Sequence, residues 1–252
     1  MFLRLVHLKI EPEMLSRFRQ HYEEKIIPRL QKMPGCQYAG LIQSEHHRDE
    51  CISMTLWDSQ SHAETYEKSG LYEELLKGVQ PYLSDSSLWK IQLSKDLKPE
   101  YLPVQEEPVV KSYTFLAKKD SKILDQEKTH LLYLRIVSVK IKPGKIEEFK
   151  EIYSKEIIPA LHSVKGCRYA YSTGSIEDKN EVISVTIWDS KEDADAYEKS
   201  GLFDKLTEKL KHTFAELYQW KMALKDEGIR QAVTTEDLSV KYYSIVTGKS
   251  FY

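Results

Sequence analysis

Tyrosine and tryptophan side chains recur in two matching sets along the chain, and these side chains are the ones best suited to chemistry. A buried phenol can orient a substrate hydroxyl or a reduced-oxygen intermediate, but it can equally bond to the backbone. A tryptophan at the end of an apolar run can line an aromatic pocket or serve as a packing anchor. The first set is Tyr22, Trp57 and Tyr66, and the second is Tyr153, Trp188 and Tyr197.

Other kinds of chemistry have little support in the sequence. It contains none of the glycine-rich nucleotide motifs and no nucleophile-elbow motif. His46 and His47 lack cysteines or carboxylates at ligand spacing, so we expect no metal site. His7 is replaced by Ser138 in the second set. We therefore expect no charged or imidazole residue to be repeated at both sites.

The composition narrows the class of protein. The 252 residues include 37 Lys and Arg against 39 Asp and Glu, well mixed along the chain. This balance argues against a nucleic-acid partner, which requires a basic surface. The sequence shows no secretory signal and no apolar run long enough to span a membrane. The three cysteines are too few for a disulfide framework, so we expect a cytoplasmic protein.

The chain is an internal duplication. Residues 4–91 align without a gap with residues 135–222. The longest shared stretches are Trp57-Asp58-Ser59 with Trp188-Asp189-Ser190, and the sequence from Tyr66 to Leu71 with that from Tyr197 to Leu202. Two copies are too few for a solenoid, so a duplicated globular unit is the better interpretation.

Each copy predicts the element order βαββαβ. Pro28 and Pro159 should break or kink the first helix, because proline removes a helical hydrogen bond. Gly70 should end the second helix. In the first copy the predicted elements are a strand at 3–10, a helix after Pro12, a hairpin of 36–45 and 50–57, a helix capped by Ser59, and a closing strand at 88–93.

This order predicts an α+β fold made of tandem ferredoxin-like repeats. Helices cover only one face of such a sheet, so the second copy should cover the other face and form an intramolecular α/β barrel. The predicted units are 1–117 and 131–252, joined by a linker at 118–130, and the Pro- and charge-rich stretch 95–108 allows the copies to pair. Trailing strands near 109–117 and 239–247 should add to a sheet edge, and the chain should be a monomer or form a dimer through another surface.

The run from Trp57 to Leu71 resembles the antibiotic biosynthesis monooxygenase (ABM) family, whose members are dimeric α/β barrels. The matching features are a strand ending in Trp-Asp-Ser, a helix containing Ala63 and Tyr66, and then Lys-Ser-Gly-Leu. The resemblance covers both copies and implies a cavity between the helices and the sheet. It also implies oxygenation of a small aromatic or quinol-type molecule, with no metal, flavin or other cofactor.

Residues of the family's known sites can be carried over by position. The Asn, Trp and His of its haem-degrading members fall on Val6, Tyr66 and Leu76, and on Val137, Tyr197 and Thr207. Neither Leu76 nor Thr207, which stand at the histidine position, can ligate haem iron, so we do not expect haem degradation. An Asn of the polyketide-oxidising members falls on Ser53 and Ser184. The predicted catalytic residues are Tyr66, Tyr197, Ser53 and Ser184, and the predicted substrate-binding residues are Trp57, Trp188, Tyr22, Tyr153, Val6, Val137, Leu76 and Thr207.

Two hypotheses for the function remain open. The chain is either a cofactor-independent monooxygenase acting on a small aromatic or quinol-type compound, or a non-catalytic member that binds small molecules or takes part in a stress response. The space between helices and sheet distinguishes them. A cavity of a few hundred Å³ favours the enzyme, as expected of a ligand pocket, and a filled one favours the alternative.

Overall fold

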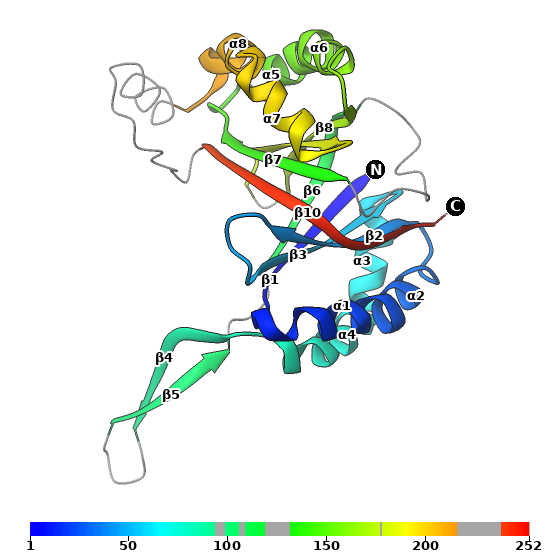
Figure 1. The fold of residues 1–252 in the computed structure, drawn as a ribbon, viewed down its shortest axis with the longest axis vertical. Coiled ribbons are helices and arrows are strands. Elements are labelled where there is room, and N and C mark those ends of the chain that lie inside the picture. The colour runs from blue at the N-terminus through cyan, green and yellow to red at the C-terminus, as the bar shows by residue number, and fades with distance from the viewer. Residues whose placement is uncertain (94–98, 106–108, 119–131, 177, 216–237, 252) are drawn as a thin grey trace.

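Eight strands close a single barrel that uses both copies of the repeat (Figure 1). The computed structural model describes residues 1–93, 99–105, 109–118, 132–176, 178–215 and 238–251. The order around the barrel is β1-β3-β2-β10-β7-β9-β8-β6. The strands are β1 (Phe2–Lys9), β2 (Cys36–Ser44), β3 (Glu50–Trp57), β6 (Val109–Lys118), β7 (Tyr133–Lys140), β8 (Cys167–Ser175), β9 (Glu181–Trp188) and β10 (Leu238–Ser250).

The trailing strands add to sheet edges, as the sequence predicted, and they also join the two copies. β6 pairs with β1 of its own copy and with β8 of the other copy. β10 pairs with β7 of its own copy and with β2 of the first copy. The chain continues past β10 to Phe251, whose backbone N–H donates to the Gln37 carbonyl at 2.8 Å. The trailing strand of each copy therefore closes the barrel by pairing with a strand of the other copy.

The strand predicted at 88–93 exists, but it does not close the sheet. It belongs to β4 (Asp85–Leu93), which pairs only with β5 (Pro99–Gln105) in a separate two-stranded sheet that extends away from the barrel (Figure 1). The reason is that β3 and β6 pair with the two edges of β1, which leaves no edge of β1 for β4. The chain touches the end of β1 at a single bridge between Ile10 and Leu83. The stretch 95–108 thus includes a strand.

The helices cover the outside of the barrel (Figure 1). Their caps follow the prediction: the side chains of Ser59 and Ser190 accept backbone N–H bonds at the starts of two helices. Gly70 and its counterpart Gly201 separate successive helices with φ of 76° and 71°, a conformation that favours glycine. The α-helices are α1 (Leu15–His21), α2 (Ile27–Leu30), α3 (Gln60–Lys68), α4 (Leu71–Val79), α5 (Ile146–Ile152), α6 (Ile158–His162), α7 (Lys191–Lys199) and α8 (Leu202–Leu210), and 3₁₀ turns span Pro12–Met14, Gln80–Tyr82 and Lys211–Thr213.

The predicted break at the two prolines is a widened turn instead. A π-helical turn (Tyr22–Ile26) connects α1 to α2, and a second (Tyr153–Ile157) connects α5 to α6. In the first, the N–H of Ile27 reaches back to the carbonyl of Tyr22, and Pro28 then falls in the first turn of α2. Because a first turn has no internal partner for that N–H, proline is tolerated there.

Three hydrophobic clusters hold the molecule together. Two lie between helices and sheet, one in each copy. The third fills the barrel and combines both copies, for example Leu5 and Ile52 with Ile136 and Ile183. Both faces of the central strands are therefore buried, which confirms that the twin copy covers the sheet face that the helices leave open.

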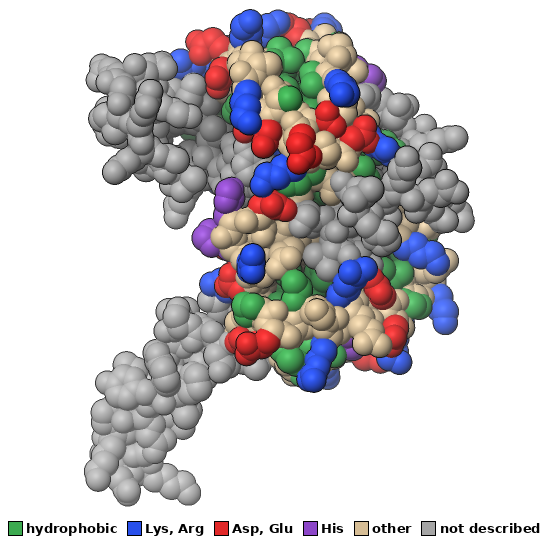
Figure 2. All heavy atoms as spheres, in the orientation of Figure 1, with side chains coloured by type: hydrophobic (Ala, Val, Ile, Leu, Met, Phe, Trp, Pro, Cys, Tyr) green, Lys and Arg blue, Asp and Glu red, His purple; other side chains and the backbone are tan. Residues whose placement is uncertain are grey.

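The surface carries mixed charge. Figure 2 shows acidic and basic side chains interspersed over the visible face. Within the described part of the chain, no helix is long and apolar enough to cross a membrane. The predicted linker at 118–130 lies outside the described residues except for Lys118, the last residue of β6.

Candidate functional site

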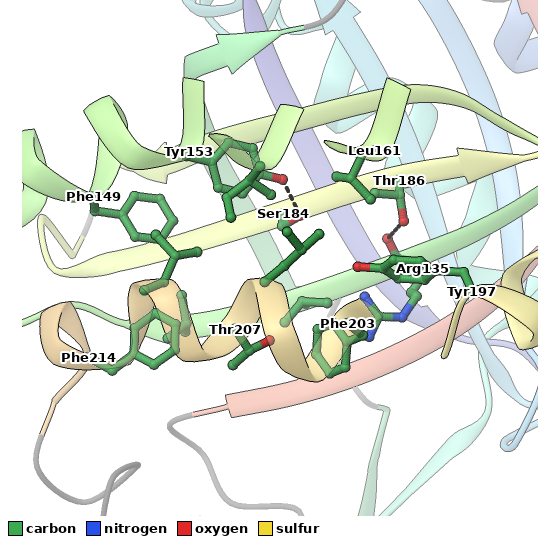
Figure 3. Close-up of a pocket in the computed structure, with 15 residues that line it drawn as sticks. Arg135, Phe149, Tyr153, Leu161, Ser184, Thr186, Tyr197, Phe203, Thr207 and Phe214 are labelled. Atoms are coloured by element: carbon green, nitrogen blue, oxygen red, sulfur yellow. Dashed lines mark hydrogen bonds between the residues drawn. The ribbon is translucent and has the colours of Figure 1, made fainter. Parts of the chain in front are cut away.

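Each copy has one pocket between its helices and its sheet. The first-copy pocket, with a cavity of about 40 Å³, lies between β1, β3 and the helices α1, α3 and α4. The second-copy pocket, about 60 Å³, lies in the equivalent place (Figure 3). Both cavities are far smaller than the roughly 300 Å³ or more of pockets for drug-sized ligands.

Paired residues on two neighbouring strands form the floor of the first-copy pocket. Arg4 of β1 lies opposite Thr55 of β3, and Val6 lies opposite Ser53. Side chains on one strand alternate between faces, so these four point toward the helices while Leu5 points into the barrel. The second copy repeats the floor with Arg135 opposite Thr186 and Val137 opposite Ser184.

A tyrosine from the π-turn bonds to the floor serine in each copy. The Tyr22 hydroxyl lies 2.8 Å from Ser53 Oγ and donates to the Gly40 carbonyl at 3.1 Å. The Tyr153 hydroxyl lies 2.6 Å from Ser184 Oγ. Burial raises the pKa of Tyr153 to about 12 and raises that of Tyr22 further. Both phenols therefore stay protonated at neutral pH.

The second tyrosine of each set approaches from the helix side. Tyr66 of α3 is 3% exposed and Tyr197 of α7 is 5% exposed, and each lines its pocket. Burial raises the pKa of both phenols. Neither hydroxyl has a hydrogen-bond partner among the residues that the structure describes. Each hydroxyl can therefore donate a hydrogen bond to a ligand in its pocket.

The tryptophans pack against these tyrosines on the side away from the cavities. Trp57 and Trp188 are fully buried; the ring of Trp57 stacks on Tyr66 at a centroid distance of 5.2 Å, and that of Trp188 lies tilted against Tyr197 at 5.0 Å. Each indole N–H donates to a floor threonine at 2.9 Å. The two tryptophans do not line the cavities. Every other predicted site residue lines one of the pockets, namely Val6, Tyr22, Ser53, Tyr66 and Leu76, and Val137, Tyr153, Ser184, Tyr197 and Thr207.

A buried arginine lines each pocket, and the sequence interpretation missed it. Arg4 and Arg135 are both 2% exposed, and their Nε atoms donate to Glu67 and Glu198 at 2.9 and 2.7 Å. The expectation that no charged residue repeats at both sites is therefore wrong. The evidence was present in the sequence, because the gapless alignment begins at this arginine pair and also matches the two glutamates.

Aromatic rings hold the guanidinium groups in place. The Cζ of Arg4 lies 4.2 Å from the ring centre of Tyr72 and 5.5 Å from that of Tyr66. The Cζ of Arg135 lies 4.1 Å from the ring centre of Phe203. Such contacts stabilise a desolvated cation. Tyr72 and Phe203 occupy equivalent positions, so the two pockets differ here by the one hydroxyl of Tyr72.

The chemistry that these walls allow follows from their side chains. Arginines and tyrosines are the ionisable residues that line the cavities, together with serine and threonine hydroxyls. The pockets can therefore donate hydrogen bonds and stabilise negative charge, but their described walls supply no base that works near neutral pH. Across the described residues, no group of three or more His, Cys, Asp or Glu could hold a metal ion.

These features define a duplicated dimeric α/β-barrel protein with one helix-to-sheet pocket per copy. The family model for antibiotic biosynthesis monooxygenase matches residues 1–77 and 132–209, so the chain belongs to the ABM family in two tandem copies. None of the curated proteins is similar enough to match.

Solved structures share the whole fold at low sequence identity. A protein from Lactobacillus acidophilus described as a candidate monooxygenase has a TM-score of 0.65 at 13% identity, with 99% of this chain and 95% of that chain covered. A similarly described protein from Fusobacterium nucleatum has a TM-score of 0.67 at 9% identity, covering 99% and 94%. An anthrone oxidase-like protein has a TM-score of 0.57 at 13% identity, covering 99% and 92%. These likenesses show the fold.

Proposed function

We propose that the chain is a cofactor-independent monooxygenase that oxidises a small single-ring phenol or quinol in its helix-to-sheet pockets. The observation that carries the proposal is a buried tyrosine that lines each pocket beside a buried arginine, with no described hydrogen-bond partner for its hydroxyl. Membership of the ABM family supports the same class of reaction.

The cavity volumes limit the size of the substrate. One water needs about 10–15 Å³ of such volume, so 40 to 60 Å³ corresponds to a few waters. A polycyclic phenol does not fit this conformation. We propose that a single ring enters when the side chain next to the arginine shifts, which is Tyr72 in one copy and Phe203 in the other.

The proposed reaction needs no reductant besides the substrate. A phenol and O₂ yield a quinone and water: the substrate loses its phenolic proton and one ring hydrogen, one oxygen atom becomes the new carbonyl, and the other leaves as water. The substrate supplies all four electrons. Without a base in the described walls, the arginine would stabilise the phenolate, and the Tyr22–Ser53 or Tyr153–Ser184 pair would give a proton to the departing oxygen.

A second function, binding without turnover, is favoured by the cavity size. Side chains fill most of the space between helices and sheet, as expected for a non-catalytic member. Haem degradation is not proposed, because Leu76 and Thr207 occupy the positions where the family's mechanism requires an imidazole.

We also propose that the chain works as a monomer in a reducing, cytoplasmic environment. The barrel already contains the second copy that a single-domain relative must recruit. Cys36, Cys51 and Cys167 are buried thiols that form no disulfide. Light scattering during gel filtration should give the mass of one chain, and the mass of two chains would overturn the assignment.

Oxygen uptake by the purified protein tests the proposed reaction. The measurement uses a panel of single-ring phenols and quinols, with a chelator present to remove adventitious metal. We expect uptake with at least one of them, and its loss in the double variant Tyr66→Phe/Tyr197→Phe. Tyr38→Phe is the matched control, because Tyr38 is a fully buried tyrosine that faces the barrel interior instead of a pocket. Ligand binding without uptake would favour the second function.

A further inference from the structure

We propose that the arginine and tyrosine at one end of each pocket bind an ionised oxygen, so that the ligand is an aromatic anion, a phenolate or a carboxylate. This inference rests on the proposed function in one respect: it names the charge state of the molecule that enters the same pockets. It concerns Arg4 with Tyr66, and Arg135 with Tyr197.

The geometry directs the guanidinium edge toward the cavity. Glu67 occupies the Nε side of Arg4, and the Cζ of Arg4 lies over the rings of Tyr72 and Tyr66. The terminal nitrogens of Arg4 have no hydrogen-bond partner among the described residues, although the side chain is almost fully buried. In the second copy, Figure 3 shows the guanidinium of Arg135 and the hydroxyl of Tyr197 ending on the same side, facing the cavity.

The tyrosine supplies a second donor beside the guanidinium. The ring of Tyr66 lies 5.5 Å from the Cζ of Arg4, and the ring of Tyr197 lies 5.8 Å from that of Arg135. Burial keeps both phenols protonated, so they donate and do not repel an anion. A cation and a neutral donor that converge inside an apolar pocket are the arrangement that fixes an anionic oxygen.

The charge of the glutamate offsets this arrangement only in part. The side chain of Arg4 is 3% exposed and that of Glu67 44%, and the second copy gives 2% for Arg135 and 31% for Glu198. The carboxylates thus lie on the water side, where solvent screens them, while the guanidinium groups lie inside. A ligand in the cavity meets the arginine first. Removal of the glutamate charge should therefore strengthen anion binding, whereas a purely structural ion pair predicts no such gain.

Two probes of matched shape test the proposal on the full-length protein. 4-Nitrophenol ionises near neutral pH and reports its charge by its absorbance band, and nitrobenzene is its neutral counterpart. 4-Nitrobenzoate serves as the carboxylate arm. We expect the phenolate form to bind about tenfold more tightly than nitrobenzene, as hydrogen bonds to a charged group typically give. The bound probe should show the phenolate band at a pH where the free probe is mostly protonated.

Variants separate the contributions. Glu67→Gln/Glu198→Gln should tighten the binding of the anionic probes and leave nitrobenzene unchanged. Tyr66→Phe/Tyr197→Phe should weaken the anionic probes about tenfold and leave nitrobenzene unchanged. Tyr38→Phe should change neither, because it lies inside the barrel. Preference for 4-nitrobenzoate over 4-nitrophenolate would identify the ligand as a carboxylate.

The results that overturn the inference are distinct from those that overturn the proposed function. Equal affinity for phenolate and nitrobenzene overturns the anion site, even if oxygen uptake occurs. Unchanged or weaker anion binding in the folded glutamine variant also overturns it, as does unchanged anion binding in the phenylalanine variant. Charge-selective binding without oxygen uptake upholds the anion site and overturns the monooxygenase.

Discussion

Replacing Phe251 with alanine should destabilise both copies together. Phe251 follows the last strand of the second copy, yet it is 7% exposed and packs in the helix-to-sheet core of the first copy. Truncation of a buried phenylalanine costs about 3–5 kcal/mol. Because Phe251 lies just past the end of β10, its surroundings can relax, and we expect a loss of about 3 kcal/mol. Ile176→Ala is the control, since Ile176 is 38% exposed and should change stability by less than about 0.5 kcal/mol.

Urea unfolding of protein labelled with fluorotryptophan measures this effect at separate places. Trp57 reports on the first copy and Trp188 on the second, and tryptophan-to-phenylalanine variants assign the ¹⁹F resonances. The barrel shares its strands between the copies, so both resonances of Phe251→Ala should lose their native signal at the same lower urea concentration. If Trp57 alone shifts while Trp188 keeps the midpoint of the unmodified protein, the two copies are independent domains and the reasoning fails.

Three further predictions concern buried hydroxyls and thiols. Tyr38→Phe should raise the free energy of unfolding by about 1 kcal/mol in thermal or urea melts, because the Tyr38 hydroxyl is buried without a described partner; a loss of stability would contradict this. Tyr22→Phe should cost about 1–2 kcal/mol and Tyr153→Phe about 1 kcal/mol, since the Tyr22 hydroxyl bonds to both Ser53 and the Gly40 carbonyl, whereas that of Tyr153 bonds to Ser184; equal losses of stability in the same assay would count against it. Burial raises the pKa of Cys36 and Cys51 from 9.0 to about 12, so the unfolded chain loses these protons first and stability should fall as the pH rises through this interval. Urea melts at stepped alkaline pH measure that fall, and a stability that stays flat above pH 9 would refute it.

Much of the fold could be predicted because it depends on local patterns and on the duplication. The hairpin of β2 and β3 follows from two apolar runs separated by a polar loop. Ser59 and Ser190 are N-cap residues, and this residue type predicts the starts of α3 and α7. The barrel follows from an argument about burial: a sheet with helices on one face needs a cover for the other. These inferences use neighbouring residues or the copy itself, and both are visible in the sequence.

Other features depend on competition between distant segments. β4 has the pattern of a strand, but β6 takes the edge of β1 that it would need, and no local pattern reveals that outcome. The π-turn before Pro28 arises because the helix can widen where a break was expected. Strand propensity alone does not identify a partner.

The arginine of the site was missed for a different reason. An isolated charge in an apolar strand is usually interpreted as a solvated side chain, whereas Arg4 is buried by Tyr66 and Tyr72 from helices that are remote in sequence. Comparison of the two copies would have found it, because both the arginine and its glutamate are kept. The tyrosines and serines were predicted as site residues, and the structure brings them to the same cavities, while Trp57 and Trp188 support them from behind.

The position of a bound phenol tests the central claim most directly. A crystal of the full-length protein soaked with 4-bromophenol can be measured at the bromine absorption edge, so that the anomalous signal fixes the ring and its orientation. The account predicts one bromine in each helix-to-sheet pocket, with the phenol oxygen within hydrogen-bond distance of Tyr66 and Arg4 in one copy and of Tyr197 and Arg135 in the other. Bromine inside the barrel, or a ring that points its oxygen away from the arginine, would contradict it.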